Sequence, residues 1–268
     1  MSVALTISPR DIPLLPGGML EILRLANDPN VSLAQIERSI GRDQALAVRV
    51  LTVANSSYYG CSRRIDSVRG AVALLGTRQI QNIAAALAIA PAFDSEHGPR
   101  LWSHAVAAAL WSQRIVKELG LPSIEYLFTT ALMHDIGIVM LLTRATDLEL
   151  GCIELARTDA RSLQEIELAQ LGCNHADLGA QVCRAWNLPD RVANLIADHH
   201  GGESIDAPAA ILALADHLAV VHGSPAFEGM PAREPTKAEL AAIGMQPSAL
   251  ANLGRHAEAV AAEAAGLS

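Results

Sequence analysis

The chain has 268 residues, of which 51% are hydrophobic, 3% aromatic and 18% charged, and its formal net charge is −8. This length suits one large domain or two small ones, with enough apolar residues for a sizeable core. An acidic chain with few aromatic residues argues against direct binding to nucleic acid, which needs a basic surface and rings that stack on bases.

Apolar residues recur at helical spacing along the whole chain, and no segment alternates apolar and polar residues for long enough to predict a strand. In chain order, the predicted helices cover residues 17–27, 33–40, 44–54, 66–75, 77–90, 101–119, 124–142, 147–157, 162–171, 175–186, 189–200, 208–221, 237–243 and 248–265. Ser32 and Asp43 are expected to cap two of them, and Ser162 with Glu165 fits a capping box. The sequence therefore predicts an all-α fold.

An adjacent His134–Asp135 pair lies in the middle of the apolar segment 129–142. His and Asp side chains are costly to bury unless each finds a partner or a metal ion. Imidazole nitrogen and carboxylate oxygen together suit a first-row divalent ion. A buried His–Asp hydrogen bond would also explain the pair, and on these two residues alone both interpretations stay open. Gly137, inside the same predicted helix, is expected to permit close packing or a bend beside the pair.

Further side chains that can bind a metal also lie in segments with helical apolar spacing: His104, His175, His199, His200 and Asp216. One buried histidine is usually structural, but five histidines and two aspartates are hard to satisfy with hydrogen bonds alone. Cys173, two residues before His175, is a softer candidate ligand. The sequence thus predicts a metal site of seven residues, with a metal-free, hydrogen-bonded cluster as the alternative.

The order of these residues, His, His-Asp, His, His-His and Asp, resembles that of the HD metal-dependent phosphohydrolase superfamily and its HD-GYP-like layout. The wording IGRDQALAVRVLTVANSSYYG at 40–60 is similar to that of the HDOD (HD-related output domain) family, which the chain resembles more closely. The resemblance covers roughly residues 10–222. It implies an N-terminal helical subdomain, 10–92, packed on an HD-like helical bundle, 100–222. Residues 223–268 are then an exposed Pro- and Gly-rich loop and a C-terminal helical extension.

The resemblance also implies a set of metal ligands, because the Asp of the HD pair bridges two ions in HD-type enzymes. Carried over by position, one ion would be held by His104, His134, Asp135 and Asp216. A second ion would be held by Asp135, His175, His199 and His200. The expected cofactor is one or two divalent ions of Fe, Mn, Zn, Ni or Mg.

Three departures from the HD-GYP-like pattern count against catalysis. Ile138 stands where that pattern has a lysine after Ile-Gly, so the cation near the scissile phosphate is missing. The sequence HHGGE at 199–203 lacks the Gly-Tyr-Pro loop, and Arg100, four residues before His104, replaces a Glu that would recruit a third ion. Without these groups, a metal could bind water but would lack the charge clamp that phosphoryl transfer needs.

Two function classes stay open. The departures favour an HDOD-type bacterial signal-transduction or regulatory module, which is non-catalytic and acts through signalling proteins as partners. The complete ligand set instead suits a metal-dependent phosphohydrolase that acts on a nucleotide or a cyclic dinucleotide. The seven candidate metal ligands are the predicted site residues under both interpretations. No other catalytic or cofactor-binding residue is assigned.

The sequence also predicts where the protein works. The N-terminus has no basic region followed by an apolar stretch, so no signal peptide is expected. The four cysteines form no CxxC pair, which is typical of reduced thiols in a cytosolic protein. Residues 83–93 are the longest apolar run and are too short to span a membrane. We therefore expect a cytoplasmic protein without a membrane span.

Overall fold

The computed structural model describes residues 5, 11–12, 15, 17–56, 58–60, 64–159, 161–201 and 205–267, and the regular elements within them are all helical. The predicted all-α fold is therefore confirmed. The α-helices are α1 (Gly17–Ala26), α2 (Leu33–Gly41), α3 (Gln44–Ala54), α4 (Val68–Leu75), α5 (Thr77–Ile89), α6 (Gly98–Glu118), α7 (Leu127–Met133), α8 (Ile136–Arg144), α9 (Thr146–Ala156), α10 (Leu163–Leu171), α11 (His175–Ala185), α12 (Asp190–Ala197), α13 (Ala207–Val221), α14 (Lys237–Ala242), α15 (Leu250–Leu253) and α16 (Ala257–Leu267).

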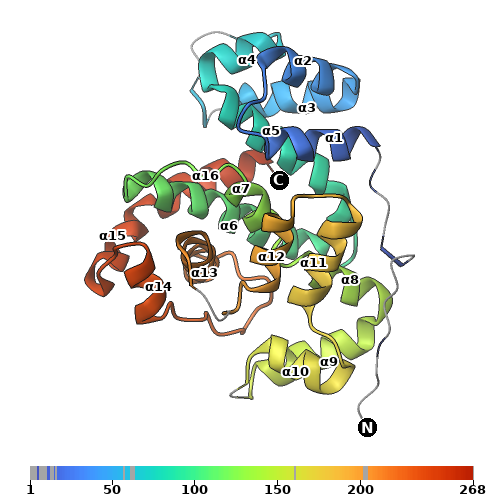
Figure 1. Ribbon diagram of the computed structural model, residues 1–268, viewed down its shortest axis with the longest axis vertical. Coiled ribbons are helices and arrows are strands. Elements are labelled where there is room, and N and C mark those ends of the chain that lie inside the picture. The colour runs from blue at the N-terminus through green and yellow to red at the C-terminus, as the bar shows by residue number, and fades with distance from the viewer. Residues whose placement is uncertain are drawn as a thin grey trace.

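Helices α1 to α5 lie together at the top of Figure 1, and α5 is the helix on which the others in this group pack. The predicted caps start two of them, since the Ser32 side chain accepts a hydrogen bond from the backbone N–H of Gln35 and Asp43 accepts one from Leu46. α5 is buried on every side from Ile80 to Ile89. A helix that is apolar all round belongs inside the protein, and α5 accordingly reaches down to contact α7.

The lower part of the molecule is built around α6, which packs against both α7 and α13. α11 packs on α8 and α12, while α9 and α10 form a hairpin at the bottom of Figure 1. The Ser162–Glu165 capping box at the start of α10 is present as predicted. This arrangement brings parts of five helices, α6, α8, α11, α12 and α13, close together in the interior of the protein. The division of the chain at 10–92 and 100–222 stays a prediction.

The prediction of one helix at 124–142 is wrong, because the structure ends α7 at Met133 and starts α8 at Ile136. His134 and Asp135 occupy the turn between these two helices. Gly137 then allows α8 to touch α11: a Cβ added at Gly137 would lie 1.9 Å from the carbonyl oxygen of His175. Close packing at this glycine, which the sequence predicted, is thus confirmed.

The stretch Leu127–Arg144 is long and apolar enough to cross a membrane by length and composition, which the sequence analysis did not recognise. The His134–Asp135 pair hid it by interrupting the apolar run. Of this stretch, 89% is buried inside the helical bundle. Among the described residues it is the one helical stretch with this property.

Candidate metal centre

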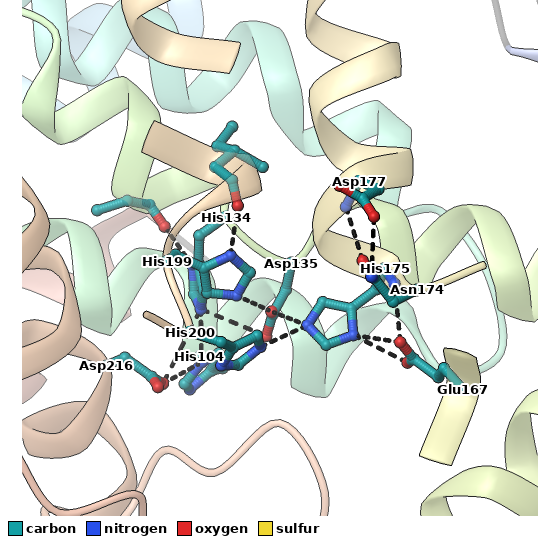
Figure 2. Close-up of polar contacts among 12 residues, drawn as sticks. His104, His134, Asp135, Glu167, Asn174, His175, Asp177, His199, His200 and Asp216 are labelled. Carbon is teal, nitrogen blue, oxygen red and sulfur yellow. Dashed lines mark hydrogen bonds and ion pairs between the residues drawn. The ribbon is translucent and has the colours of Figure 1, made fainter. Parts of the chain in front are cut away.

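The seven predicted residues come from five places in the fold and point toward one another (Figure 2). His104 lies in the middle of α6, His134 and Asp135 lie in the turn between α7 and α8, and His175 is the first residue of α11. Asp216 lies in α13, and His199 and His200 lie in the turn after α12. The predicted helix 189–200 is therefore too long, because α12 ends at Ala197.

Asp135 stands between two groups of histidines. Its Oδ2 atom is 3.3 Å from Nε2 of His134 and 3.6 Å from Nε2 of His104. Its Oδ1 atom is 3.6 Å from Nε2 of His199 and 3.8 Å from Nε2 of His175. A carboxylate that turns one oxygen to each group has the geometry of a bridge between two ions.

The first donor group consists of His104, His134 and Asp135, all of them buried. Asp216 adds a second carboxylate to it, with Oδ1 3.1 Å from Nε2 of His104 and 3.9 Å from Nε2 of His134. Two imidazoles and two carboxylates form a donor set of the kind that binds first-row divalent ions.

The second donor group consists of Asp135, His175, His199 and His200, whose ligand atoms all lie within 4.8 Å of one another. Nε2 of His175 and Nε2 of His200 are 2.6 Å apart, and the rings of His199 and His200 have centroids 3.9 Å apart. Three imidazoles with one carboxylate also suit a divalent transition ion. Cys173 belongs to neither group, so the structure gives no support to it as a ligand.

Backbone carbonyl groups hold three of the rings in one orientation. Nδ1 of His104 is 2.8 Å from the Ser224 oxygen, and Nδ1 of His134 is 2.7 Å from the Ala131 oxygen. Nδ1 of His199 is 2.6 Å from the Ile196 oxygen. Because a carbonyl oxygen can only accept, each Nδ1 must carry the proton, which leaves the Nε2 lone pair directed into the cluster.

This orientation brings the Nε2 lone pairs of neighbouring histidines close together. Nε2 of His104 is 3.2 Å from Nε2 of His134, and two neutral rings that are both protonated at Nδ1 cannot hydrogen-bond to each other there. Nε2 of His199 is buried and has no hydrogen-bond partner. Lone pairs that converge without a donor are satisfied by a cation, so the residues present fit a divalent metal.

Protons can also satisfy some of these lone pairs. Burial opposes the charging of His104, yet the hydrogen bond to Asp216 and the nearby carboxylates raise the pKa of His104 to about 9. Burial lowers the pKa of His134, although the Asp135 charge opposes this shift. Burial, followed by the charges of His199 and His175, lowers the pKa of His200 well below its usual range. Burial also opposes the ionisation of Asp135, but the surrounding histidines, His134 first, hold its pKa well below its usual range. The cluster thus keeps its carboxylates ionised and only part of its imidazoles charged.

Two buried glutamates behind His175 were missed by the sequence analysis. The two carboxylate oxygens of Glu167, Oε2 and Oε1, are 2.7 and 2.9 Å from Nδ1 of His175. Oε2 also accepts a hydrogen bond of 2.7 Å from the backbone N–H of His175. Glu149 on α9 is also fully buried, and its two oxygens have no hydrogen-bond partner. Burial, and then the charge of Glu167, raises the pKa of Glu149 to about 9. The signal for both was their position on the apolar face of a helix, four residues from other buried residues such as Leu163 and Ile153.

A cavity of about 290 Å³ opens beside the cluster. His104, Asp135, His175, His200 and Asp216 line its floor. Its roof is the segment 224–233, in which Phe227 and Met230 are partly buried and pack against the core. The sequence analysis expected the Pro- and Gly-rich loop that begins at residue 223 to be exposed, and in the structure the segment 224–233 is partly exposed and partly covered. The loop is held over the site because Ser224 accepts the hydrogen bond from His104.

The cations around the cavity are paired. Arg161 forms two contacts of 3.1 and 2.6 Å with the Asp159 carboxylate, and Arg233 forms a two-pronged ion pair with Glu239. Ile138, at the position where the HD-GYP-like pattern has a lysine, lines the cavity with an apolar side chain. Arg100 is largely exposed and forms an ion pair of 2.7 Å with Glu228.

Parts of the sequence-based analysis fall outside the described residues. Gly202 and Glu203 of the HHGGE stretch do so, and Cys61 does as well. The other three cysteines, Cys152, Cys173 and Cys183, are free thiols, in agreement with the expected absence of disulfides among them.

A family model described as the HDOD domain matches residues 12–201 of the chain. The fold is similar to that of an HDOD domain protein with unknown function from Geobacter sulfurreducens, with a TM-score of 0.80 and 23% identity over 96% of this chain and 93% of that one. A proposed phosphohydrolase from Shewanella amazonensis SB2B has a TM-score of 0.76 and 21% identity, over 97% and 96% of the two chains. A proposed signal transduction protein from Marinobacter aquaeolei VT8 has a TM-score of 0.75 and 22% identity, over 99% and 62%. At these identities, the likenesses show the fold alone.

Among curated proteins, an uncharacterized protein of Treponema pallidum (strain Nichols) is 28% identical over 193 residues. These residues make up 71% of this chain and 38% of that protein. The chain therefore spans well under half the length of this relative. Asp216 and the roof segment 224–233 lie beyond the residues that the family model matches.

Proposed function

Because this chain belongs to the HDOD domain family, we propose that it is a cytoplasmic regulatory module that acts in signal transduction through protein partners and does not turn over a substrate. Its metal centre organises the fold in this proposal, and the outer surface of the helices carries the interactions. Two large apolar side chains, Val48 on α3 and Leu74 on α4, are 64% and 62% exposed.

The observation that carries the proposal is the state of the charges around the cavity. In addition to any bound ions, transfer of a phosphoryl group calls for cationic side chains that neutralise the developing charge on the phosphoryl oxygens. Ile138 offers none, and both arginines that line the cavity, Arg161 and Arg233, are already engaged by carboxylates. Among the described lining residues, no unpaired Arg or Lys faces the cluster.

Divalent ions, where bound, would supply Lewis acidity at the cluster. The residues that would hold them are His104, His134, Asp135, His175, His199, His200 and Asp216. These side chains come from helices that are far apart in the sequence, so their common engagement would fix α6, α11 and α13 relative to one another. Elemental analysis of the purified protein measures whether one ion, two ions or none are present.

The test of the proposal combines activity with binding. We expect the full-length protein, loaded with Mn²⁺, to show no turnover of phosphomonoesters, phosphodiesters or a cyclic dinucleotide above that of a His134→Ala/Asp135→Ala double variant. We also expect a partner captured by the tagged wild-type protein to be retained by the double variant wherever circular dichroism shows that the variant is folded. Loss of the partner from a folded variant would contradict the proposal.

A metal-dependent phosphohydrolase is the second candidate function. The observation that favours it is Asp135, whose two oxygens face separate donor groups as a bridging carboxylate does in a two-ion hydrolase. Turnover of a nucleotide or cyclic dinucleotide at more than about 1 per second, lost completely in the double variant, would establish this function.

A further inference from the structure

We propose that the cavity beside the metal centre binds a small oxyanion that carries a compact apolar body, and that the segment 224–233 selects this body. The inference rests on the proposed function, since the bound ions supply the attraction for the anion. It names the ligand through which the module would be regulated. It assigns a role to a part of the chain beyond the residues 12–201 that define the family match.

With ions bound, the floor of the cavity would carry a net positive charge and would attract an anion. Two divalent ions would bring four positive charges, Asp135 and Asp216 bring two negative charges, and neutral imidazoles bring none, so the net charge is +2. With four protein ligands each, bound ions would be able to take further oxygen ligands. A phosphate, phosphonate or carboxylate group supplies both the negative charge and such oxygen ligands.

The walls of the cavity select what is attached to that group. Ile138, Leu163, Val220, Phe227 and Met230 line it, and each is apolar. The lining also includes Asp159 and Arg161, which are paired with each other, and Arg233, which is paired with Glu239. Along the apolar part of the wall, water finds few hydrogen-bond partners, so an apolar or aromatic body gains free energy by entering there. A cluster built only to hold a structural metal would not need an apolar chamber beside it.

The size of the cavity narrows the choice of ligand. Its volume of about 290 Å³ is at the lower end of the range of about 300–1,000 Å³ for small-molecule sites. One ring or a short alkyl chain with its anionic group fits this space. A cyclic dinucleotide, with two nucleosides, is too large to be enclosed in it.

The roof is anchored at both ends and is therefore a wall rather than a loose loop. At one end, Ser224 accepts the hydrogen bond from Nδ1 of His104. At the other end, Arg233 is paired with Glu239, and its carbonyl oxygen is 3.1 Å from Nδ1 of His217. Phe227 and Met230 lie between these anchors, so their side chains are held over the floor.

The test uses two probes with the same anionic group, methylphosphonate and phenylphosphonate, neither of which can be hydrolysed as an ester. Isothermal titration of the Mn²⁺-loaded full-length protein should give a Kd for phenylphosphonate about tenfold or more below that for methylphosphonate, from the added apolar burial. Phe227→Ala and Met230→Ala should each reduce this ratio to about threefold or less, with the metal content unchanged. Leu168→Ala, at an exposed position on α10, is the matched control and should leave the ratio as it is.

The outcomes separate this inference from the proposed function. If the protein holds its metal and binds the two phosphonates equally well, the apolar chamber does not select the ligand and the inference is overturned, while the metal centre stands. The same holds if both roof variants keep the full ratio. If elemental analysis after loading finds no metal, the metal centre of the proposed function fails, and the anion site fails with it.

Discussion

At the scale of single residues, the sequence predicted which seven side chains converge on the candidate site but not which residues support them. The seven side chains stood out because His and Asp are rare in apolar segments and their order is that of a known superfamily. Glu167 and Glu149 carried no such motif, and they were hidden among the exposed glutamates of amphipathic helices. Their spacing from apolar neighbours was the one signal in the sequence, and the fold shows that α9 and α10 turn these two carboxylates inward behind His175.

Glu167 is expected to position His175 for metal binding. In a Glu167→Gln variant, the Nδ1–H of His175 loses its ionised acceptor, so the ring is less basic and less firmly oriented. We expect the affinity for the metal held by the second donor group to fall about 10–100-fold. Titration of the chelated apoprotein with Mn²⁺ measures this, and Glu154→Gln, on the exposed side of α9, is the control. An unchanged affinity would show that Glu167 is a packing residue.

Glu149 makes stability depend on pH. Its pKa in the folded protein is about 9, above the ordinary value of 4.5, so the folded state holds the proton more tightly than the unfolded state. The stability that this proton contributes is fully present below about pH 4.5 and is lost as the pH rises through about 9. A Glu149→Gln variant is neutral at every pH and escapes this loss. At pH 7, we expect Glu149→Gln to unfold with a free energy up to about 3 kcal/mol higher than wild type.

Chemical denaturation of both proteins between pH 5 and pH 9 measures this effect. The difference between variant and wild type should be small at pH 5 and should grow steadily toward pH 9. A difference that is the same at all pH values would mean that Glu149 does not change its charge on unfolding.

At the scale of helices, the sequence located most elements well because their caps and apolar stripes are local signals. Ser32, Asp43 and Ser162 start their helices as predicted. The break at His134–Asp135 was not predictable in this way, since Thr129–Leu142 has good helical spacing throughout. The turn there follows from contacts with α6 and α11, which are distant in sequence. The position of the roof was not predictable for the same reason: Pro- and Gly-rich composition predicts a loop but not what the loop covers.

Gly137 and Gly151 form a matched pair for testing how closely α8 and α11 pack. A methyl group at Gly137 would lie 1.9 Å from the His175 carbonyl oxygen, whereas at Gly151 on α9 nothing lies within 4 Å. We expect Gly137→Ala to lower the free energy of unfolding by about 1–3 kcal/mol and to weaken metal binding through His175. Gly151→Ala should raise it by about 0.5–1 kcal/mol. Equal effects at the two sites, measured by urea denaturation, would contradict the close packing.

At the scale of the whole molecule, the candidate metal centre joins segments that are more than a hundred residues apart, from His104 on α6 to Asp216 on α13. If the centre holds ions as proposed, removing them should loosen the entire lower bundle and not one loop. At a free metal concentration about one hundredfold above Kd, bound metal adds about 2.7 kcal/mol per site to the free energy of unfolding. Thermal unfolding with and without a chelator measures this. If the melting temperature does not change although elemental analysis confirms that metal was removed, the centre does not organise the fold.

The hydrogen bond from His104 to Ser224 has a consequence for how this module can be exchanged between proteins during evolution. The family match ends at residue 201, yet a ligand, Asp216, and the acceptor that orients His104 both come later in the chain. A recombination event with its breakpoint at that boundary would transfer five histidines and one aspartate but leave behind the groups that complete and orient the first donor group. Inheritance of the complete candidate centre therefore requires the chain to be passed on as one piece through residue 224.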